Sequence, residues 1–136
     1  MKIIIYVADL NRESNPFYKY LSLKELGRKL GYKVIGLSHT PRYIPGIKDL
    51  PLYVRFMEKI GFPLDMVNIN KKIILYAKKY NPNIIIIEKG LTIRSKTLLK
   101  IKEINKDIKL VCYCVDNMEK RFNNSIYFKS CIKYYD

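Results

Sequence analysis

The stretch Ile84-Ile85-Ile86-Ile87-Glu88, which lies between Pro82 and Gly90, decides the fold class of this chain. Four consecutive β-branched residues bounded by a proline and a turn predict a short strand that is buried on both faces. Such strands are typical of parallel sheets. Three further runs have the same character and predict strands over Ile3–Val7, Lys33–Leu37 and Lys109–Val115.

The intervals between these strands have helical spacing. The first predicted helix runs from about Pro16 to Leu30, with Ser14 or Asn15 as its N-cap and Gly31 as its stop. Its apolar residues are expected to form one buried face: Phe17, Tyr20, Leu21, Leu23, Leu26 and Leu30. Further helices are predicted over Asn68–Tyr80, Ser95–Ile104 and Ser125–Tyr134.

The alternation of strands and helices predicts an α/β fold. We expect a Rossmann-like open parallel sheet of about four strands with helices on both faces, because parallel neighbours need crossover connections. A length of 136 residues is that of one domain, residues 1–136. Such a domain buries enough surface to fold without a disulfide or a metal.

The chain is strongly basic, with 26 Lys and Arg against 12 Asp and Glu, a net charge of +14. Counting along the sequence gives 20 Lys and only 6 Arg, whereas recognition of bases and phosphates favours Arg. Abundant Lys, Ile, Asn and Tyr together are typical of an A/T-rich coding background, which we take as the main source of the charge. A basic nucleic-acid-binding or protein-interaction module is the alternative, but the lysines are scattered and no aromatic-basic RNA-binding signature is present, so nucleic acid is not the expected partner.

The cysteines and the start of the chain indicate its compartment. Cys112, Cys114 and Cys131, with His39 as the one histidine, have no zinc-site spacing. Cys112 and Cys114 alternate within an apolar run, which predicts buried thiols of a reduced protein. The apolar run at Ile3–Val7 is too short for a signal peptide or a membrane span. We therefore expect a cytoplasmic protein.

Polar residues follow each predicted strand, at the edge where open parallel sheets bind ligands. These loops are Asp9–Arg12, Ser38–Arg42, Glu88–Gly90 and Asp116–Met118. Asp and Asn at such positions also close turns and cap helices, which is the alternative role for each of them. The long segment from His39 to Asp65 contains four prolines around a helical patch at Leu52–Ile60, and excursions of this kind are often functional.

Several common site motifs are absent from the sequence. The first strand-to-helix turn has neither GxGxxG nor GxxxxGK[ST], so a dinucleotide or P-loop phosphate site is not supported. No GxSxG motif is present, which argues against acyl transfer. Asp9 stands alone after the first strand, where a receiver-type phosphoacceptor site would need an acidic pair.

Short motifs spread over nearly the whole chain resemble one family. They are His39-Thr40-Pro41-Arg42, Lys59–Asp65, Asn70, Ile87–Ile93 with Thr97-Leu98, Val111–Met118, Asn124-Ser125 and Tyr134–Asp136. With them the chain resembles the N-terminal domain of bacterial glycosyltransferases of the two-domain GT-B kind, near the spore-maturation glycosyltransferases. Asn117 departs from the pattern, which has a second acidic residue there.

The resemblance implies a division of labour between two α/β domains. The N-terminal domain usually holds the acceptor, and the C-terminal domain grips the nucleotide-sugar. These 136 residues would supply only the acceptor half, so we expect no efficient transfer by this domain alone and no cofactor besides a nucleotide-sugar held by a second domain. The implied partners are a sugar or lipid-linked acceptor and a second GT-B domain, with self-association as a further option.

The resemblance also implies roles for individual residues. The reaction is displacement at the anomeric carbon, and a base must take the proton of the acceptor hydroxyl. The candidates for this catalytic role are, in order, Asp116, Asp9 and His39. The expected substrate-binding residues are Asn11, Arg42, Lys89, Gly90 and Asn117, and no metal is implied. Peripheral contact with the inner membrane face is a variant of this hypothesis, based on Lys71, Lys72, Lys78 and Lys79.

Overall fold

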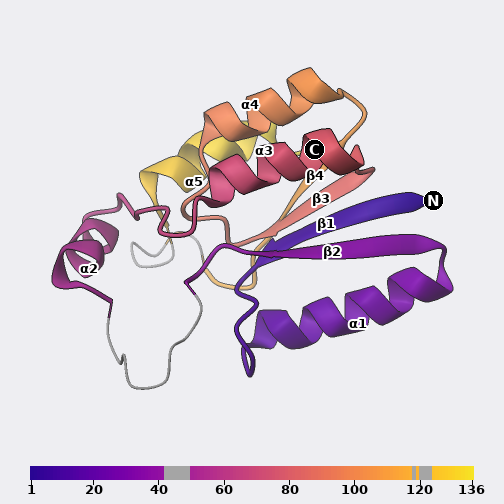
Figure 1. Cartoon of the computed structure of the whole chain (residues 1–136). Helices are drawn as coiled ribbons and strands as arrows, with labels where there is room; N and C mark the ends of the chain where they lie inside the picture. The colour runs from indigo at the N-terminus through magenta and orange to yellow at the C-terminus, as the bar shows by residue number, and fades with distance from the viewer. Residues whose placement is uncertain (42–49, 118, 120–123) are drawn as a thin grey trace.

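The computed structural model describes residues 1–41, 50–117, 119 and 124–136. Its centre is a four-stranded, all-parallel open sheet with the order β2-β1-β3-β4, which confirms the predicted Rossmann-like α/β fold (Figure 1). The strands are β1 (Lys2–Ala8), β2 (Tyr32–Ser38), β3 (Ile84–Glu88) and β4 (Lys109–Tyr113). The fourth strand therefore ends two residues before the predicted Val115.

The strand order determines where a ligand can bind. The chain moves from β1 outward to β2, then returns to the other side of β1 for β3 and β4. The connections that leave β1 and β3 therefore diverge at their carboxyl ends. This divergence is the topological switch point at which open α/β sheets bind ligands.

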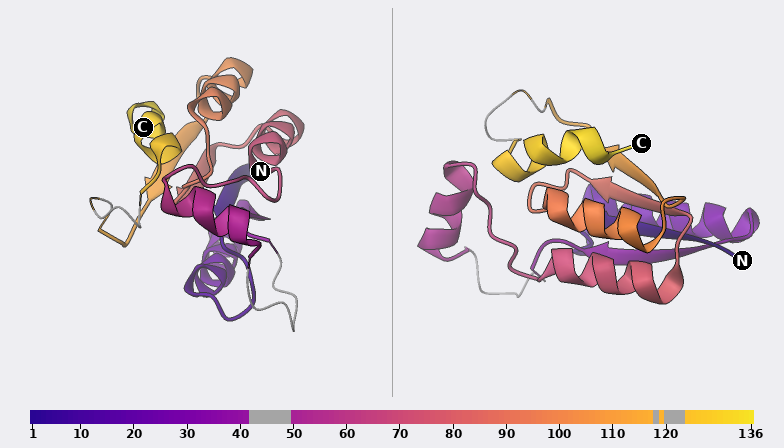
Figure 2. Two further views of the ribbon diagram at one scale, coloured as in Figure 1. Left: turned by 90° about the vertical axis from the view of Figure 1, so that its left-hand side faces the viewer. Right: turned by 90° about the horizontal axis from the view of Figure 1, so that it is seen from above.

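Helices cover both faces of the sheet, as predicted. α1 (Asn15–Lys29) lies on one face, whereas α3 (Ile69–Tyr80), α4 (Ser95–Ile104) and α5 (Ile126–Cys131) lie on the other (Figure 2). The predicted helix over Ser125–Tyr134 is α5 followed by the 3₁₀ turn η2 (Ile132–Tyr134). The remaining helix, α2 (Leu52–Lys59), stands beyond the carboxyl ends of the strands.

Two hydrophobic clusters follow from the alternation of side chains along the strands. The larger one lies under α3, α4 and α5 and contains residues such as Ile5, Ile73, Ile85, Ile87 and Ile101, all fully buried. The smaller one lies under α1 and consists of Ile4, Tyr6, Ala8 and Val34.

α1 begins as predicted, but its predicted face is only partly buried: Tyr20 and Leu23 pack against the smaller cluster, whereas three leucines do not. Ser14 is the N-cap, with its side chain accepting a hydrogen bond from the Phe17 amide. Leu21, Leu26 and Leu30 are 44%, 52% and 64% exposed, and Gly27 is the buried residue of the helix. The reason is close packing at Gly27, which brings the helix backbone down onto β2 and leaves these leucines outside the contact.

The cysteine environments differ from the prediction of buried thiols. Cys131 is buried, but Cys112 and Cys114 are partly exposed. The sulfurs of Cys112, in β4, and of Cys114, just after β4, lie 3.6 Å apart. Within the described part of the chain, no helix has the length and apolar character needed to span a bilayer.

Candidate functional site

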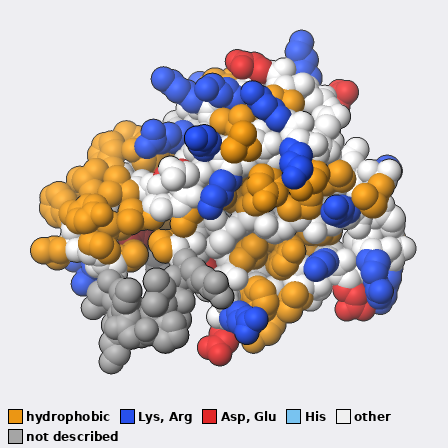
Figure 3. Space-filling model, viewed as in Figure 1, with side chains coloured by type: hydrophobic (Ala, Val, Ile, Leu, Met, Phe, Trp, Pro, Cys, Tyr) orange, Lys and Arg blue, Asp and Glu red, His pale blue; other side chains and the backbone are white. Residues whose placement is uncertain are grey.

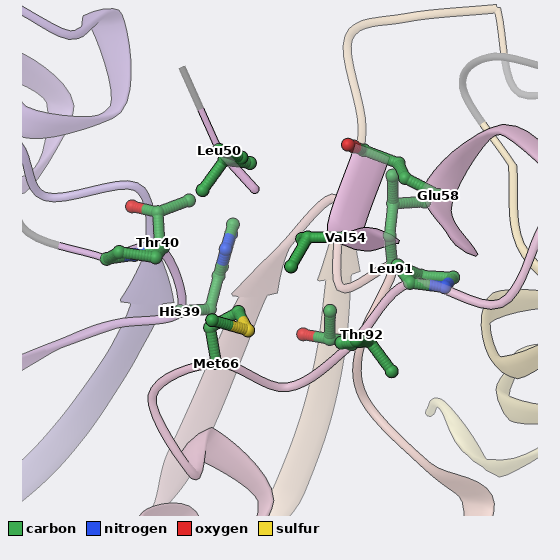
Figure 4. A pocket seen from close by; sticks show the side chains of 11 residues that line it. His39, Thr40, Leu50, Val54, Glu58, Met66, Leu91 and Thr92 are labelled. Carbon is green, nitrogen blue, oxygen red and sulfur yellow. The ribbon is translucent and has the colours of Figure 1, made fainter. Parts of the chain in front are cut away.

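A small pocket lies at the carboxyl edge of the sheet. Its walls come from the loop after β2, from α2 with the segment that follows it, and from the loop after β3. Its volume is about 130 Å³, and its lining is mostly apolar, including Val54, Met66 and Leu91 (Figure 4). The polar residues in the lining are His39, Thr40, Glu58 and Thr92.

His39 is held in this pocket from two directions by main-chain atoms. Its amide continues the sheet ladder by donating to the Ala8 carbonyl oxygen at 3.1 Å. Its ring nitrogen Nε2 lies 3.1 Å from the Glu88 carbonyl oxygen, which can only accept a hydrogen bond. Nε2 therefore carries a proton, and in the neutral ring Nδ1 is the atom with the free lone pair.

The protonation state of His39 follows from its surroundings. Burial lowers the pKa of the imidazole below its usual value, while the hydrogen bond to the Glu88 carbonyl, the Asp9 carboxylate, the main chain of His39 itself and the Glu88 carboxylate oppose part of that effect. The ring is therefore neutral at neutral pH. A neutral imidazole with a fixed donor at Nε2 and an acceptor at Nδ1 is suited to receive a proton from a bound alcohol.

Thr92 supplies a second polar group to the same pocket. Its hydroxyl oxygen is buried and finds no hydrogen-bond partner within the described part of the chain. Figure 4 shows this oxygen on the side of the residue that faces His39 and Met66. An unpaired buried hydroxyl is costly, so a ligand or water that bonds to it would be stabilised.

Asp9 organises the loops behind His39. Its Oδ1 accepts hydrogen bonds from the Thr40 hydroxyl at 2.6 Å and from the Asn11 side-chain amide at 2.7 Å. The Asn11 amide group also donates to the Pro41 carbonyl oxygen at 3.1 Å. These bonds join the loop after β1 to the loop after β2, so Asp9 and Asn11 fix the position of the segment that carries His39.

Asn70, at the start of α3, fixes the opposite wall of the pocket. Its side chain donates to the Thr92 carbonyl oxygen at 2.9 Å and accepts from the Thr97 hydroxyl at 2.7 Å. It also donates to Asp65 at 2.8 Å and accepts from the Arg94 amide at 2.9 Å. The carboxamide therefore connects the start of α3 to the loop that contains Thr92 and to the first turn of α4.

Lys89 and Asp116 form an ion pair beside the site, with a distance of 2.5 Å between Nζ and the carboxylate. Both side chains are partly exposed. Lys89 and Gly90 have positive φ values of 63° and 36°, and the Gly90 amide donates to the Glu88 carbonyl oxygen at 2.8 Å. Asn117 Oδ1 accepts from the Glu119 amide at 2.9 Å. These residues shape the turns after β3 and β4 and do not line the pocket.

Glu88 belongs to one of the candidate loops, but the sequence analysis assigned it no role of its own. Its carboxylate is buried at the end of β3, on the α1 side of the sheet, and accepts hydrogen bonds from the Tyr6 hydroxyl and from Lys19 Nζ, the latter at 2.7 Å. An acidic residue that shares a face with Ile84 and Ile86 was the available signal, because a buried carboxylate needs a partner. Lys19 lies within the apolar part of α1 and is that partner.

The structure divides the predicted site residues into three groups. His39 lines the pocket, with Asp9 and Asn11 directly behind it. Lys89, Gly90, Asp116 and Asn117 lie in the turns after β3 and β4. Arg42 lies outside the described residues.

The described residues contain no group of three or more His, Cys, Asp or Glu side chains arranged to hold a metal ion. No protein-family model matches this chain, and no curated protein sequence matches it either. The glycosyltransferase resemblance therefore stays a prediction.

Proposed function

We propose that this domain is the acceptor-binding half of a GT-B-type glycosyltransferase and that it holds an acceptor alcohol in the pocket between β2, α2 and β3. One observation carries the proposal: a neutral imidazole, oriented by the main chain, lines a small apolar pocket at the switch point of a parallel sheet. This is the arrangement that a base for an alcohol requires.

The dimensions and lining of the pocket suit one end of an acceptor. A volume of about 130 Å³ is close to that of a cavity of about 150 Å³ that holds a benzene molecule. The apolar wall would contact the carbon skeleton, while the His39 imidazole and the Thr92 hydroxyl would bind the acceptor oxygen. A group of that size with one hydroxyl fits better than a whole disaccharide.

In the proposed reaction His39 is the base. The acceptor oxygen forms a bond to the anomeric carbon of the donor sugar, its proton moves to His39 Nδ1, and the nucleoside diphosphate leaves with the electrons of the broken bond. The imidazolium formed in this way would be stabilised by the carboxylates of Asp9 and Glu88, both of which favour the charged ring.

This assignment changes the order of the three candidate bases. Asp116 is paired with Lys89 at 2.5 Å, and Asp9 Oδ1 accepts three hydrogen bonds from Asn11 and Thr40. Neither carboxylate lines the pocket, whereas His39 does. We therefore place His39 first and Asp9 as a positioning residue. The Lys89–Asp116 pair lies in the turns after β3 and β4, where it could meet an anionic acceptor or donor phosphate.

The donor would be held by a second α/β domain, either in the same polypeptide or as a separate subunit. The sequence has no glycine-rich phosphate loop of its own. Transfer by residues 1–136 is therefore expected only when a nucleotide-sugar-binding domain is present.

Binding to the pocket can be tested without any donor domain. Nuclear magnetic resonance titration with phenol and cyclohexanol is expected to shift the His39 and Thr92 signals. Val54→Phe would fill the pocket and abolish these shifts, whereas Leu75→Phe, on the exposed side of α3, would leave them unchanged. Equal shifts in Val54→Phe, or none in the wild type, would overturn acceptor binding at this site.

Turnover can be tested by fusing or mixing the domain with nucleotide-sugar-binding domains and measuring nucleoside diphosphate release. His39→Asn is expected to lower turnover by about 10²- to 10⁴-fold, the usual contribution of a general base. Asp116→Asn is the comparison. If it abolished turnover while His39→Asn did not, Asp116 would be the base. Binding of nucleic acid that falls steeply with salt would instead support the basic-module alternative.

A further inference from the structure

The outer side of α2 exposes large apolar side chains to solvent. Leu52, Tyr53 and Phe56 are 81%, 59% and 59% exposed, and Val54 is the buried residue of this helix. Figure 3 shows a broad hydrophobic area over the end of the molecule where α2 lies. Scattered apolar residues are normal on a surface, but a contiguous group marks an interaction site.

The apolar area continues beyond α2. The Ile126 amide donates to the Gly61 carbonyl oxygen at 3.0 Å, which holds the start of α5 beside the end of α2. Ile60, Phe62 and Ile126 line a common groove there and are 40%, 39% and 49% exposed. We call the combined area the α2 surface, which consists of Leu52, Tyr53, Phe56, Ile60, Phe62 and Ile126.

α2 has little local stabilisation of its own, although it exposes several large apolar side chains to solvent. It has eight residues, and no side chain caps its N-terminus. Helices this short are marginal in water and depend on packing of their apolar face. Here much of the apolar character points outward, so a partner that covers the outer side would stabilise the helix.

The charges around the α2 surface indicate the chemistry of that partner. Arg55 and Lys59 are exposed on α2, and Lys129 lines the groove beside Ile126. Of the acidic residues nearby, Glu58 lines the pocket and Glu119 the groove. The whole chain carries +14, so an anionic partner is attracted and a second copy of the chain is repelled.

We propose that the α2 surface binds an anionic lipid bilayer, with α2 lying in the headgroup region. A short amphipathic helix with aromatic and leucine side chains beside Lys and Arg has the composition of an interfacial helix. α2 also stands at one end of the molecule, beyond the carboxyl ends of the strands (Figures 1 and 2), so a bilayer that covers it would also meet the start of α5 at Ile126. A fluid bilayer needs no preformed groove to cover a projecting helix.

The position of the α2 surface connects it to the pocket. Leu50, Val54 and Glu58 belong to the α2 segment and line the pocket as well. If the proposed function holds, a bilayer on the outer side of α2 would bring the pocket next to a lipid-linked acceptor. This surface differs from the lysine cluster on α3, whose exposed apolar residue is Leu75.

Tryptophan substitution gives a direct test, because the chain contains no tryptophan. Phe56→Trp places the probe on the α2 surface, and Leu26→Trp places it on the exposed side of α1 as a control. With phosphatidylglycerol-containing vesicles, Trp emission in Phe56→Trp is expected to shift to shorter wavelength and to be quenched by brominated acyl chains. Unchanged emission in Phe56→Trp, or equal changes in both variants, would overturn the proposal.

Vesicle co-sedimentation tests the same surface by loss of binding. Leu52→Glu with Phe56→Glu is expected to weaken binding to phosphatidylglycerol vesicles by about tenfold or more, whereas Leu26→Glu with Leu30→Glu is expected to bind like the wild type. The two double variants add the same charge, so a purely electrostatic attachment through other lysines would weaken both equally and contradict the proposal.

Two further measurements complete the test: one checks folding, and the other distinguishes a bilayer from a second copy of the chain as the partner of the α2 surface. Circular dichroism of both double variants checks that each remains folded. Sedimentation that shows a dimer abolished by Leu52→Glu with Phe56→Glu would assign the α2 surface to a second copy instead of a bilayer. Because vesicle binding needs no acceptor and phenol titration needs no membrane, failure of one experiment leaves the other informative.

Discussion

The imidazole Nε2 of His39 donates a hydrogen bond to the carbonyl oxygen of Glu88, 3.1 Å away. The bond joins the residue that follows β2 to the last residue of β3, across the end of the intervening strand β1. It fixes the ring, determines which nitrogen carries the proton, and places the imidazole at the switch point of the sheet.

The buried imidazole predicts a pH dependence of stability. A lowered pKa of His39 means that the unfolded chain binds a proton more readily than the folded one. The free energy of unfolding has its full value above the unfolded-state pKa of about 6.5. It falls as the pH drops through that value toward the lower folded-state pKa of His39. The free energy of urea unfolding should therefore decrease between about pH 7.5 and 5.5.

His39→Gln is the control for this titration and should flatten the pH dependence in the same interval. Since the chain has one histidine, its ring signals in a proton spectrum can be assigned without ambiguity. A folded-state pKa of His39 at or above about 6.5 would contradict the assignment of a neutral, buried ring.

The buried carboxylate of Glu88 predicts a strong dependence on Lys19. Lys19→Met removes the cation that lies 2.7 Å from the carboxylate and leaves Tyr6 as its remaining side-chain donor. Because Lys19 is 37% exposed, water can replace part of the interaction, and we expect a loss of about 1–2 kcal/mol in the free energy of unfolding. Adding Glu88→Gln to Lys19→Met should recover part of this loss, because it removes the unpaired charge.

A matched control for this ion pair lies on the surface of α1. Glu25 and Lys29 are 3.1 Å apart and about two-thirds exposed, so Lys29→Met should change the free energy of unfolding by less than about 0.5 kcal/mol. Equal effects of Lys19→Met and Lys29→Met would show that the Glu88 pair is energetically no different from a surface pair.

The contact between α1 and β2 predicts that Gly27→Ala destabilises the fold. Alanine normally favours a helix over glycine by about 1 kcal/mol. Here a Cβ would lie 2.7 Å from Val34 Cγ2 and 3.2 Å from the Tyr32 carbonyl oxygen, so α1 would have to move away from the sheet. We expect a net loss of about 1–2 kcal/mol in thermal or urea unfolding.

Val34→Ala removes the methyl group that causes the closest contact. It should therefore lower the free energy of unfolding by less in the Gly27→Ala background than in the wild type. A favourable coupling energy in this double-mutant cycle would confirm the contact. Stabilisation by Gly27→Ala alone would mean that α1 packs less closely than the structure places it.

The Cys112 and Cys131 thiols are expected to react slowly with alkylating reagents. Burial raises the pKa of Cys112 to about 12 and that of Cys131 to about 11. At about pH 8 both should label with iodoacetamide at least about a hundredfold more slowly than a free cysteine, because the thiolate is the reactive form. Peptide-mapped mass spectrometry measures each rate, and labelling in guanidinium gives the reference. Cys112 labelling as fast in the folded protein as in guanidinium would refute the raised pKa.

The fold could be predicted because its strands are so strongly patterned. A run such as Ile84–Ile87 is short, β-branched and bounded by turn residues, which favours a strand covered on both faces, and parallel topology follows from the helices between the strands. The predicted face of α1 was right for Tyr20 and Leu23 but wrong for three leucines, because apolar periodicity does not reveal where the backbone makes its closest approach. Gly27 determines that approach, and a glycine inside a helical pattern is easily read as a simple defect.

The candidate site was only partly accessible from the sequence. Residues after parallel strands must gather at one edge, so His39 and Asp9 could be grouped in advance. The pocket itself could not, because its wall comes from α2, an element whose position depends on a proline-rich segment with no periodicity to orient it. Thr92 and Glu88 gain their importance from unpaired or buried polar atoms, which exist only in three dimensions.

Because a main-chain oxygen holds His39, substitutions at position 88 can occur in the course of evolution without displacing the imidazole. Every residue at position 88 presents a carbonyl group, so substitution of the Glu88 side chain alters the charge beside the imidazole without removing its anchor. A mutation at position 88 can therefore change the pKa of the imidazole. The orientation of the ring depends on the backbone of the sheet and stays the same.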